Sequence, residues 1–308
     1  MIKIYHSTSR ARKLAELKDA KAGAWIHVVE PTPAELDALA KDFGLERDIL
    51  QDATDAHEAP RVEVDNGVTY VFCRYCRPED PDIPTEPMLV IYTNNNIITV
   101  MRSNDDILKR IINGQVQVLT TQKTKTFLYI LDQINHSYRA QLIVIAKQIL
   151  QFRSQMRQTE ASNIDLIKFI ELEEDLNEYL SALQPQALVL NALESGKYMR
   201  LYDDDRDLVD DIMLNTNELI EQCKSRLRTV VNVRQAYDVI ATNNLNKIFK
   251  RLTSIAIFLT IPTIVGGLFG MNVVLPFQDN KYAFFLVLAF IFGGMYFVAK
   301  FFSYKKWI

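Results

Sequence analysis

The sequence contains few of the residues that build catalytic or metal centres. Its 308 residues include three cysteines and four histidines. Cys73 and Cys76 form a C-x-x-C pair in a strand-like run, where residues three apart point to opposite faces, so a shared metal or a disulfide is not expected. The histidines show no metal-ligand spacing, and we find no phosphate loop, nucleophile elbow or paired-acid signature. These absences predict reduced intracellular thiols and argue against an enzyme.

Charged residues are absent from two long segments near the C-terminus. Residues 252–278 and 282–299 contain no Asp, Glu, Lys, Arg or His. About 20 apolar residues in a helix cross the ~30 Å hydrocarbon core of a membrane, so each segment predicts a membrane span. Aromatic residues suited to the membrane interface extend the second segment: Phe301, Phe302, Tyr304 and Trp307.

Basic residues predict the orientation of this helical hairpin. The loop between the spans offers only Lys281, which is offset by Asp279, whereas lysine and arginine flank the hairpin on both sides. The positive-inside rule therefore places both termini, and everything before residue 250, in the cytoplasm. Residues 1–13 have no apolar stretch, so no signal peptide is visible. We expect a multi-pass protein of the cell membrane.

Glycine and proline are missing from residues 115–184 and 197–261, which predicts long helices. From about Tyr202 the helical pattern continues without a breaker into the first span, where Pro262 is a candidate kink. Nearly 70 residues at about 1.5 Å each give roughly 100 Å of helix. A helix of this length needs support from neighbours in its own chain or in other copies. The acids of one earlier helix indicate a solvated face: Glu171, Glu173, Glu174, Asp175 and Glu178.

The first hundred residues alternate between strand and helix patterns. Thr32 is a candidate helix cap, Pro33 suits the first helical position, Glu35 completes a capping box, and Gly44 ends the helix. A second short helix is predicted at Leu45–Thr54, and residues 93–96 predict a hairpin turn. The predicted strands are Ile2–His6, Ala24–Val29, Arg61–Val64, Thr69–Tyr75, Pro87–Tyr92 and Ile97–Val100.

The predicted fold class is an α/β N-terminal cytoplasmic domain followed by a long α-helical stalk and two C-terminal transmembrane helices. The expected divisions are a 1–114 α/β domain, 115–200 long cytoplasmic helices, a 201–251 stalk helix continuous with the first span at 252–272, a 273–281 extracytoplasmic loop, a second span at 282–302 and a 303–308 basic cytoplasmic tail.

Small and hydroxylated residues form a stripe along the first span. At heptad spacing the two lines are Asn246, Thr253, Thr260, Gly267 and Phe249, Ala256, Thr263, Gly270. One interpretation is a polar seam that faces an aqueous path for a hydrated ion. The other is close helix packing, which Gly266-x-x-x-Gly270 would allow. Taken alone, the stripe leaves both open.

Neither span contains a carboxylate, which argues against a proton-coupled transporter and against a pore that strips water from a cation with fixed charges. The pattern suits a cation that stays hydrated. Mg²⁺ loses its water reluctantly. The neutral amide of Asn272 could hydrogen-bond that water shell, and copies of Asn272 around a symmetry axis would form a ring.

The motif Gly270-Met271-Asn272 at the end of the first of two C-terminal spans resembles the CorA-type magnesium channels. The ending Lys305-Lys306-Trp307-Ile308, the hairpin and the long stalk support this resemblance, which covers nearly the whole chain. It implies a homopentameric Mg²⁺ channel with Gly270, Met271 and Asn272 as the selectivity filter. The resemblance also places Asn246 near the cytoplasmic end of the pore, with Leu252 as a candidate hydrophobic gate.

The same family senses intracellular Mg²⁺ through acids at subunit interfaces. The matching acid in this chain is Asp52, whereas Gln51 stands where relatives can carry a second acid. Counting back from Asn246 gives Asp211 as the partner from the neighbouring stalk. Other acids crowd that region, and for Asp203–Asp205 we prefer helix capping to metal binding.

The loop departs from the family pattern because residues 275–279 read Leu-Pro-Phe-Gln-Asp. Asp279 is then the outer acid that attracts cations, partly cancelled by Lys281. Met271 is retained, which favours Mg²⁺, and Co²⁺ and Ni²⁺ are similar hydrated ions. The alternatives are a Zn²⁺ or Co²⁺ transporter on the same scaffold, and a membrane-anchored scaffold or signalling protein whose hairpin is only an anchor.

Overall fold

The computed structural model describes residues 1–308 apart from 12, 78–83, 105, 156–162, 272–280 and 306–308, and without the side chains of 155 and 163–166. Its chain forms two compact units. The first comprises residues 1–158 and 162–233, and the second is built from residues 234–308.

The first unit contains one seven-stranded sheet in the order β2-β1-β3-β7-β6-β5-β4. Strands β3 and β7 pair in parallel, and every other neighbouring pair is antiparallel. The strands are β1 Ile2–His6, β2 Ala15–Leu17, β3 Trp25–Val29, β4 Arg61–Asp65, β5 Val68–Cys76, β6 Thr85–Tyr92 and β7 Ile97–Met101. Six of them match predicted strands within a few residues, whereas the three-residue strand β2 was not predicted.

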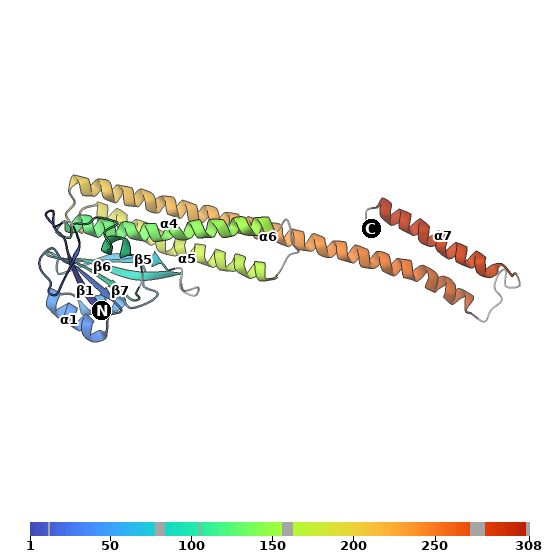
Figure 1. Ribbon diagram of the computed structural model, residues 1–308, viewed down its shortest axis with the longest axis horizontal. Coiled ribbons are helices and arrows are strands. Elements are labelled where there is room, and N and C mark those ends of the chain that lie inside the picture. The colour runs from blue at the N-terminus through green and yellow to red at the C-terminus, as the bar shows by residue number, and fades with distance from the viewer. Residues whose placement is uncertain (12, 78–83, 105, 156–162, 272–280, 306–308) are drawn as a thin grey trace. The chain divides into compact units, whose positions relative to one another are not determined.

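Helices cover both faces of this sheet (Figure 1). On one face, α1 (Pro33–Phe43) and α2 (Arg47–Asp52) bury leucines such as Leu36 and Leu50 against Val28, Phe72 and Ile98. On the other face, the long helices α4 (Lys123–Gln155) and α5 (Asn163–Glu194) contact β5, and the short α3 (Lys109–Ile112) precedes them. Burying apolar surface on both faces stabilises the sheet by about 25 cal/mol for each Å² removed from water.

Local sequence signals account for several element ends. Thr32 and Glu35 form the predicted capping box, because the Glu35 N–H donates to Thr32 Oγ1 at 3.2 Å and the Thr32 N–H donates to Glu35 Oε2 at 2.8 Å. Gly44 has a φ of 64° and ends α1, as predicted. Asn66 and Gly67 both have positive φ values, which produces the tight hairpin between β4 and β5. The predicted helix at 45–54 is shorter than expected and covers Arg47–Asp52.

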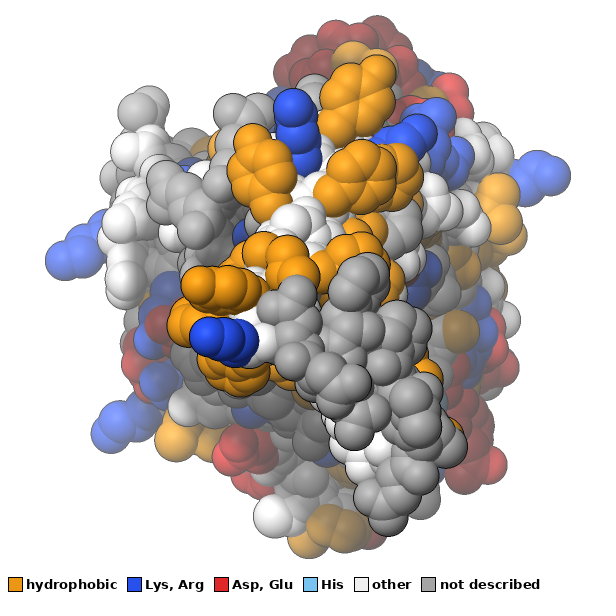
Figure 2. Space-filling model, turned by 90° about the vertical axis from the view of Figure 1, so that its right-hand side faces the viewer, with side chains coloured by type: hydrophobic (Ala, Val, Ile, Leu, Met, Phe, Trp, Pro, Cys, Tyr) orange, Lys and Arg blue, Asp and Glu red, His pale blue; other side chains and the backbone are white. Residues whose placement is uncertain are grey.

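A single helix, α6, runs from Asp203 to Phe269, and α7 covers Ala283–Tyr304. The prediction of one unbroken helix through the first span is confirmed, and α6 continues through Pro262. Both helices contain a stretch long and apolar enough to cross a membrane, and almost none of either stretch is buried within the chain. Figure 2 views the chain from the right-hand side of Figure 1, and hydrophobic side chains gather there with isolated basic residues among them. The predicted fold class is confirmed.

Candidate functional site

One face of α6 packs against α7 in the second unit. Ser254 is fully buried on this face, and the rings of Phe258 and Phe302 meet edge to face with their centroids 6.3 Å apart. Further along, Gly294 allows close approach, because a Cβ added there would lie 3.8 Å from Ile261 Cγ2. The positions 254, 258 and 261 recur at helical spacing, so α7 covers a single stripe of α6.

Most of the predicted pore-lining residues lie on the sides of α6 that face away from α7, and Thr263 lies directly opposite. Thr263 follows Ser254 by nine residues, which is two and a half turns, so the two side chains point about 180° apart. All members of the predicted stripe are exposed in the single chain: Asn246, Phe249, Leu252, Thr253, Ala256, Thr260, Thr263 and Gly267. The structure therefore brings these residues onto one face that α7 leaves uncovered.

The threonine hydroxyls of this stripe donate to their own helix. Thr260 Oγ1 donates to the Ala256 carbonyl at 2.7 Å, and Thr263 Oγ1 donates to the Leu259 carbonyl at 2.8 Å. Because each hydroxyl has one proton, its oxygen is then left with lone pairs that accept hydrogen bonds. The face therefore offers acceptors, which is what the outward-pointing hydrogens of a hydrated cation require.

The helix ends where the predicted filter begins. Gly270 N donates to the Gly266 carbonyl at 3.0 Å, and Met271 N reaches the Leu268 carbonyl at 3.4 Å. A Cβ at Gly270 would lie 3.2 Å from the Gly266 oxygen, so the last turn favours glycine here. Asn272 and Asp279 lie outside the described residues, and Lys281 is exposed in the turn before α7.

The two predicted regulatory acids lie on different elements of the first unit. Asp52 ends α2 and is half-exposed, and its Oδ2 accepts from Arg61 Nη2 at 2.8 Å. Asp211 lies on the exposed side of α6. Among the described residues, Asp52 and Asp211 have no basic partner in common. No group of three described His, Cys, Asp or Glu side chains could hold a metal ion.

Asp52 and Asp211 nevertheless fit a hydrated Mg²⁺. This ion commonly takes one or two carboxylates and keeps several waters. The half-exposed Asp52 and the exposed Asp211 are carboxylates of the kind such an ion takes.

Asp205 caps the start of α6, as predicted, whereas Asp204 makes an ion pair. Asp205 is buried, and its Oδ2 accepts from the Tyr202 N–H at 3.0 Å, which is one half of a capping box. Asp204 pairs with Lys125 at 3.1 Å.

Comparison with known proteins identifies the family. The sequence matches the family of CorA-like Mg²⁺ transporter proteins over residues 20–305. The chain belongs to this family. Since the match includes both apolar helices, the chain is a membrane protein, and α6 and α7 contain its two candidate membrane spans.

Individual CorA relatives match along most of their length. The chain is 26% identical over 274 residues to the cobalt/magnesium transport protein CorA of Methanocaldococcus jannaschii, covering 86% of this chain and 85% of the relative. It is 23% identical to the magnesium transport protein CorA of Helicobacter pylori, covering 92% and 90%. The complete structure of the M. jannaschii CorA magnesium transporter superposes with a TM-score of 0.87 at 20% identity, covering 100% of this chain and 99% of that one. This likeness shows the CorA fold.

The prediction that the acids of α5 form a solvated face is wrong in part. Glu178 lies 3.5 Å from Arg74 of β5 and accepts from Thr85 Oγ1 at 2.8 Å. Asp175 is half-buried, and burial together with the charges of Glu171 and Glu174 raises its pKa to about 6. These acids are part of the contact between helix and sheet.

Arg61 is the residue beside the predicted regulatory acid Asp52 that the sequence did not single out. Its guanidinium pairs with Asp52, Glu58 and Glu63, and it stacks 4.0 Å above the centre of the Phe72 ring. The basic position beside Pro60 was visible in the sequence, but its pairing with Asp52 requires α2 and β4 to be adjacent.

Proposed function

We propose that this CorA-family chain forms a homopentameric channel that takes up hydrated Mg²⁺ across the cell membrane, with both termini in the cytoplasm. The main support is the face of α6 that α7 leaves uncovered, which presents Thr260, Thr263 and the rest of the predicted stripe. Close packing between copies alone does not require hydroxyl oxygens on that face. Five copies arranged around an axis would turn the face into a lined path.

Each part of the path has a proposed role. Asn246 and Leu252 form the cytoplasmic end and hydrophobic gate, the threonines accept hydrogen bonds from the water shell, and Gly270, Met271 and Asn272 form the filter. Asp279 and Lys281 set the charge at the outer entrance. Mg²⁺ is favoured because the spans carry no carboxylates to replace its water.

Mg²⁺ also serves as the regulatory ion in this proposal. Asp52 of one subunit and Asp211 of its neighbour would hold a hydrated ion between them while the pore is shut. At low intracellular Mg²⁺ the two carboxylates would repel each other and release the stalk helices, which opens the gate. Asp52 is half-exposed and Asp211 is exposed in the single chain, so both can reach an interface between subunits.

Flux of Mg²⁺ into proteoliposomes tests the transport function. Wild type should transport Mg²⁺, Asn272→Ala should abolish uptake while keeping the assembly intact, and Asn280→Ala is the matched control from the same connecting segment. Normal uptake by Asn272→Ala would refute the filter assignment. Absence of flux in all three, with the protein inserted and internal Mg²⁺ removed, would favour a membrane anchor.

Ion competition and native mass spectrometry test the remaining claims. Mg²⁺ uptake should be competed by Co²⁺ and Ni²⁺, whereas Zn²⁺ uptake that Mg²⁺ does not compete would support a zinc transporter on this scaffold. The solubilised protein should contain five copies, and another stable number would contradict the pentamer.

A further inference from the structure

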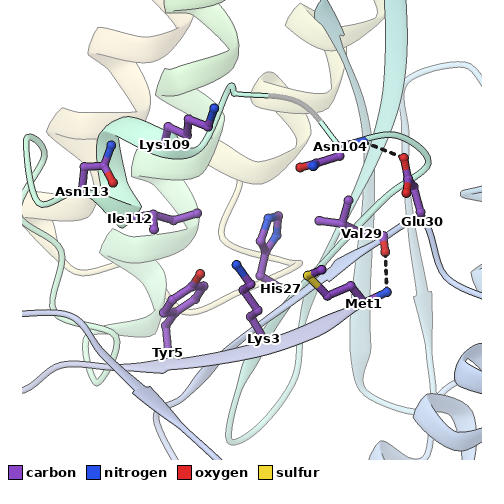
Figure 3. A pocket seen from close by; sticks show the side chains of 10 residues that line it. All are labelled: Met1, Lys3, Tyr5, His27, Val29, Glu30, Asn104, Lys109, Ile112 and Asn113. Carbon is purple, nitrogen blue, oxygen red and sulfur yellow. Dashed lines mark hydrogen bonds between the residues drawn. The ribbon is translucent and has the colours of Figure 1, made fainter.

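A cavity of about 470 Å³ lies beside β1, β3 and α3, in the first unit (Figure 3). Lys3, Tyr5 and His27 from the sheet contribute to one side of it, and Lys109 and Ile112 of α3 contribute to another. Its volume lies within the range of about 300–1,000 Å³ that small-molecule sites occupy. Neither the proposed ion path nor the regulatory acids use these residues.

Sheet register brings the polar groups of the cavity together. Lys3 and His27 are directly opposite partners in the antiparallel pair of β1 and β3, so their side chains lie on the same face. In Figure 3 both side chains project from the strands toward α3. Burial, reinforced by the charge of Lys3, lowers the pKa of His27 to about 4, so the imidazole is neutral near pH 7.

A hydrogen-bond chain through Trp25 and Thr99 occupies Nδ1 of His27, so Nε2 is the nitrogen available to a ligand. Trp25 Nε1 donates to Thr99 Oγ1 at 3.0 Å, and Thr99 Oγ1 lies 2.9 Å from His27 Nδ1. In one tautomer the threonine oxygen accepts the indole proton and donates its own proton to Nδ1, and the imidazole proton is then on Nε2. His27 is only 6% exposed, and its Nε2 has no hydrogen-bond partner among the described residues. In that tautomer, Nε2 carries an N–H donor that is left for a ligand in the cavity.

The cavity has an excess of positive charge. Among the residues that the structure describes, Lys3 makes no ion pair, and Lys109 pairs with Asp106 of its own turn. The acid at the rim is Glu30, whose Oε1 already accepts from the Asn104 N–H at 3.3 Å. Ile112 and Val29 supply apolar surface beside these charges.

We propose that this cavity binds a small soluble organic phosphate. Lys3 and Lys109 hold the phosphoryl group, His27 Nε2 donates a hydrogen bond to it, and the organic part packs against Ile112 and Val29. A phosphoryl group suits the site better than a carboxylate, because its three terminal oxygens can meet three separate donors. The proposal is independent of transport, since it concerns residues of the first unit alone.

Calorimetric titration of the full-length solubilised protein with phenyl phosphate tests this site. Wild type should bind it, whereas Lys3→Met should bind at least about tenfold more weakly because a charge-assisted hydrogen bond is lost. Lys109→Met should weaken binding likewise, and Lys41→Met, which changes an exposed lysine of α1, is the matched control. Thermal unfolding of each variant checks that it remains folded.

Two further ligands separate the contribution of the phosphoryl group from that of the organic part. Phenol should not bind measurably, and inorganic phosphate should bind more weakly than phenyl phosphate because it makes no apolar contact. Absence of phenyl phosphate binding at millimolar concentration, equal binding by wild type and Lys3→Met, or binding of phenol would overturn the proposal. Inorganic phosphate that binds as tightly as phenyl phosphate would overturn the assignment of the organic part.

Discussion

Replacing Arg61 by glutamine should make the proposed regulatory site more sensitive to Mg²⁺. The guanidinium lies 2.8 Å from Asp52 Oδ2 and thus competes with any cation for that carboxylate. Asp52 has no other basic partner among the described residues, so the substitution frees its charge. Glutamine keeps hydrogen-bonding capacity but removes the positive charge.

The size of the effect follows from the exposure of the pair. The Asp52 side chain is 47% exposed and that of Arg61 is 29% exposed, so solvent screens their attraction strongly. Opposite unit charges about 4 Å apart attract by about 1 kcal/mol in water, and measured surface pairs are worth no more than this. A gain of about 1 kcal/mol corresponds to roughly fivefold tighter Mg²⁺ binding.

Protection against proteolysis by increasing Mg²⁺ measures this affinity. The concentration for half-protection should fall roughly fivefold in Arg61→Gln and should stay unchanged in Arg47→Gln. Arg47 is the matched control because it lies on α2, as Asp52 does, but pairs with Asp37, at 2.5 Å. The reasoning fails if Arg61→Gln retains the wild-type midpoint, or if Asp52→Asn protects as well as wild type does.

Three further substitutions test other parts of the structure. The pKa of Asp175 is raised to about 6 from an unfolded value near 4, so its relative stabilisation is complete below pH 4 and lost as pH rises through 6. Asp175→Asn should therefore raise the free energy of unfolding at pH 8 by about 1 kcal/mol, after allowance for solvent screening, and so raise Tm at pH 8 but not at pH 4. An equal Tm shift at both pH values would contradict this. Phe302→Ala should lower Tm because Phe302 is 5% exposed against Phe258, whereas Phe301→Ala, at 51% exposed, should have little effect. Thr263→Val removes an acceptor from the uncovered face and should lower Mg²⁺ flux several-fold, and unchanged flux would argue against a lining role.

Features determined by neighbouring residues could be predicted from the sequence. The capping box at Thr32, the end of α1 at Gly44 and the unbroken helix through Pro262 each depend on residues a few positions apart. The strand β2 was not predicted because three residues are too few to show an alternating pattern. The Asn66-Gly67 pair was a usable signal for the turn between two strands that were predicted separately.

Features determined by packing could not be predicted. Glu178 and Arg74 are about a hundred positions apart in the sequence, so no helical pattern distinguishes a solvated glutamate from one that pairs with a strand. The cavity beside His27 depends on the register of β1 against β3, which brings Lys3 opposite the histidine. Residue types alone gave His27 no role, because a histidine without ligand spacing has many structural explanations.

Packing also helps to separate the two explanations of the stripe on α6. If the small residues served only to seat α7, they would lie on the face that holds Ser254 and Phe258, whereas Thr263 points about 180° away from it. The face is thus available to something other than α7. Hydroxyls that already donate to their own helix offer only acceptors, and water bound to a divalent cation presents donors outward. A surface of neutral acceptors holds such an ion weakly enough for it to leave, which conduction requires.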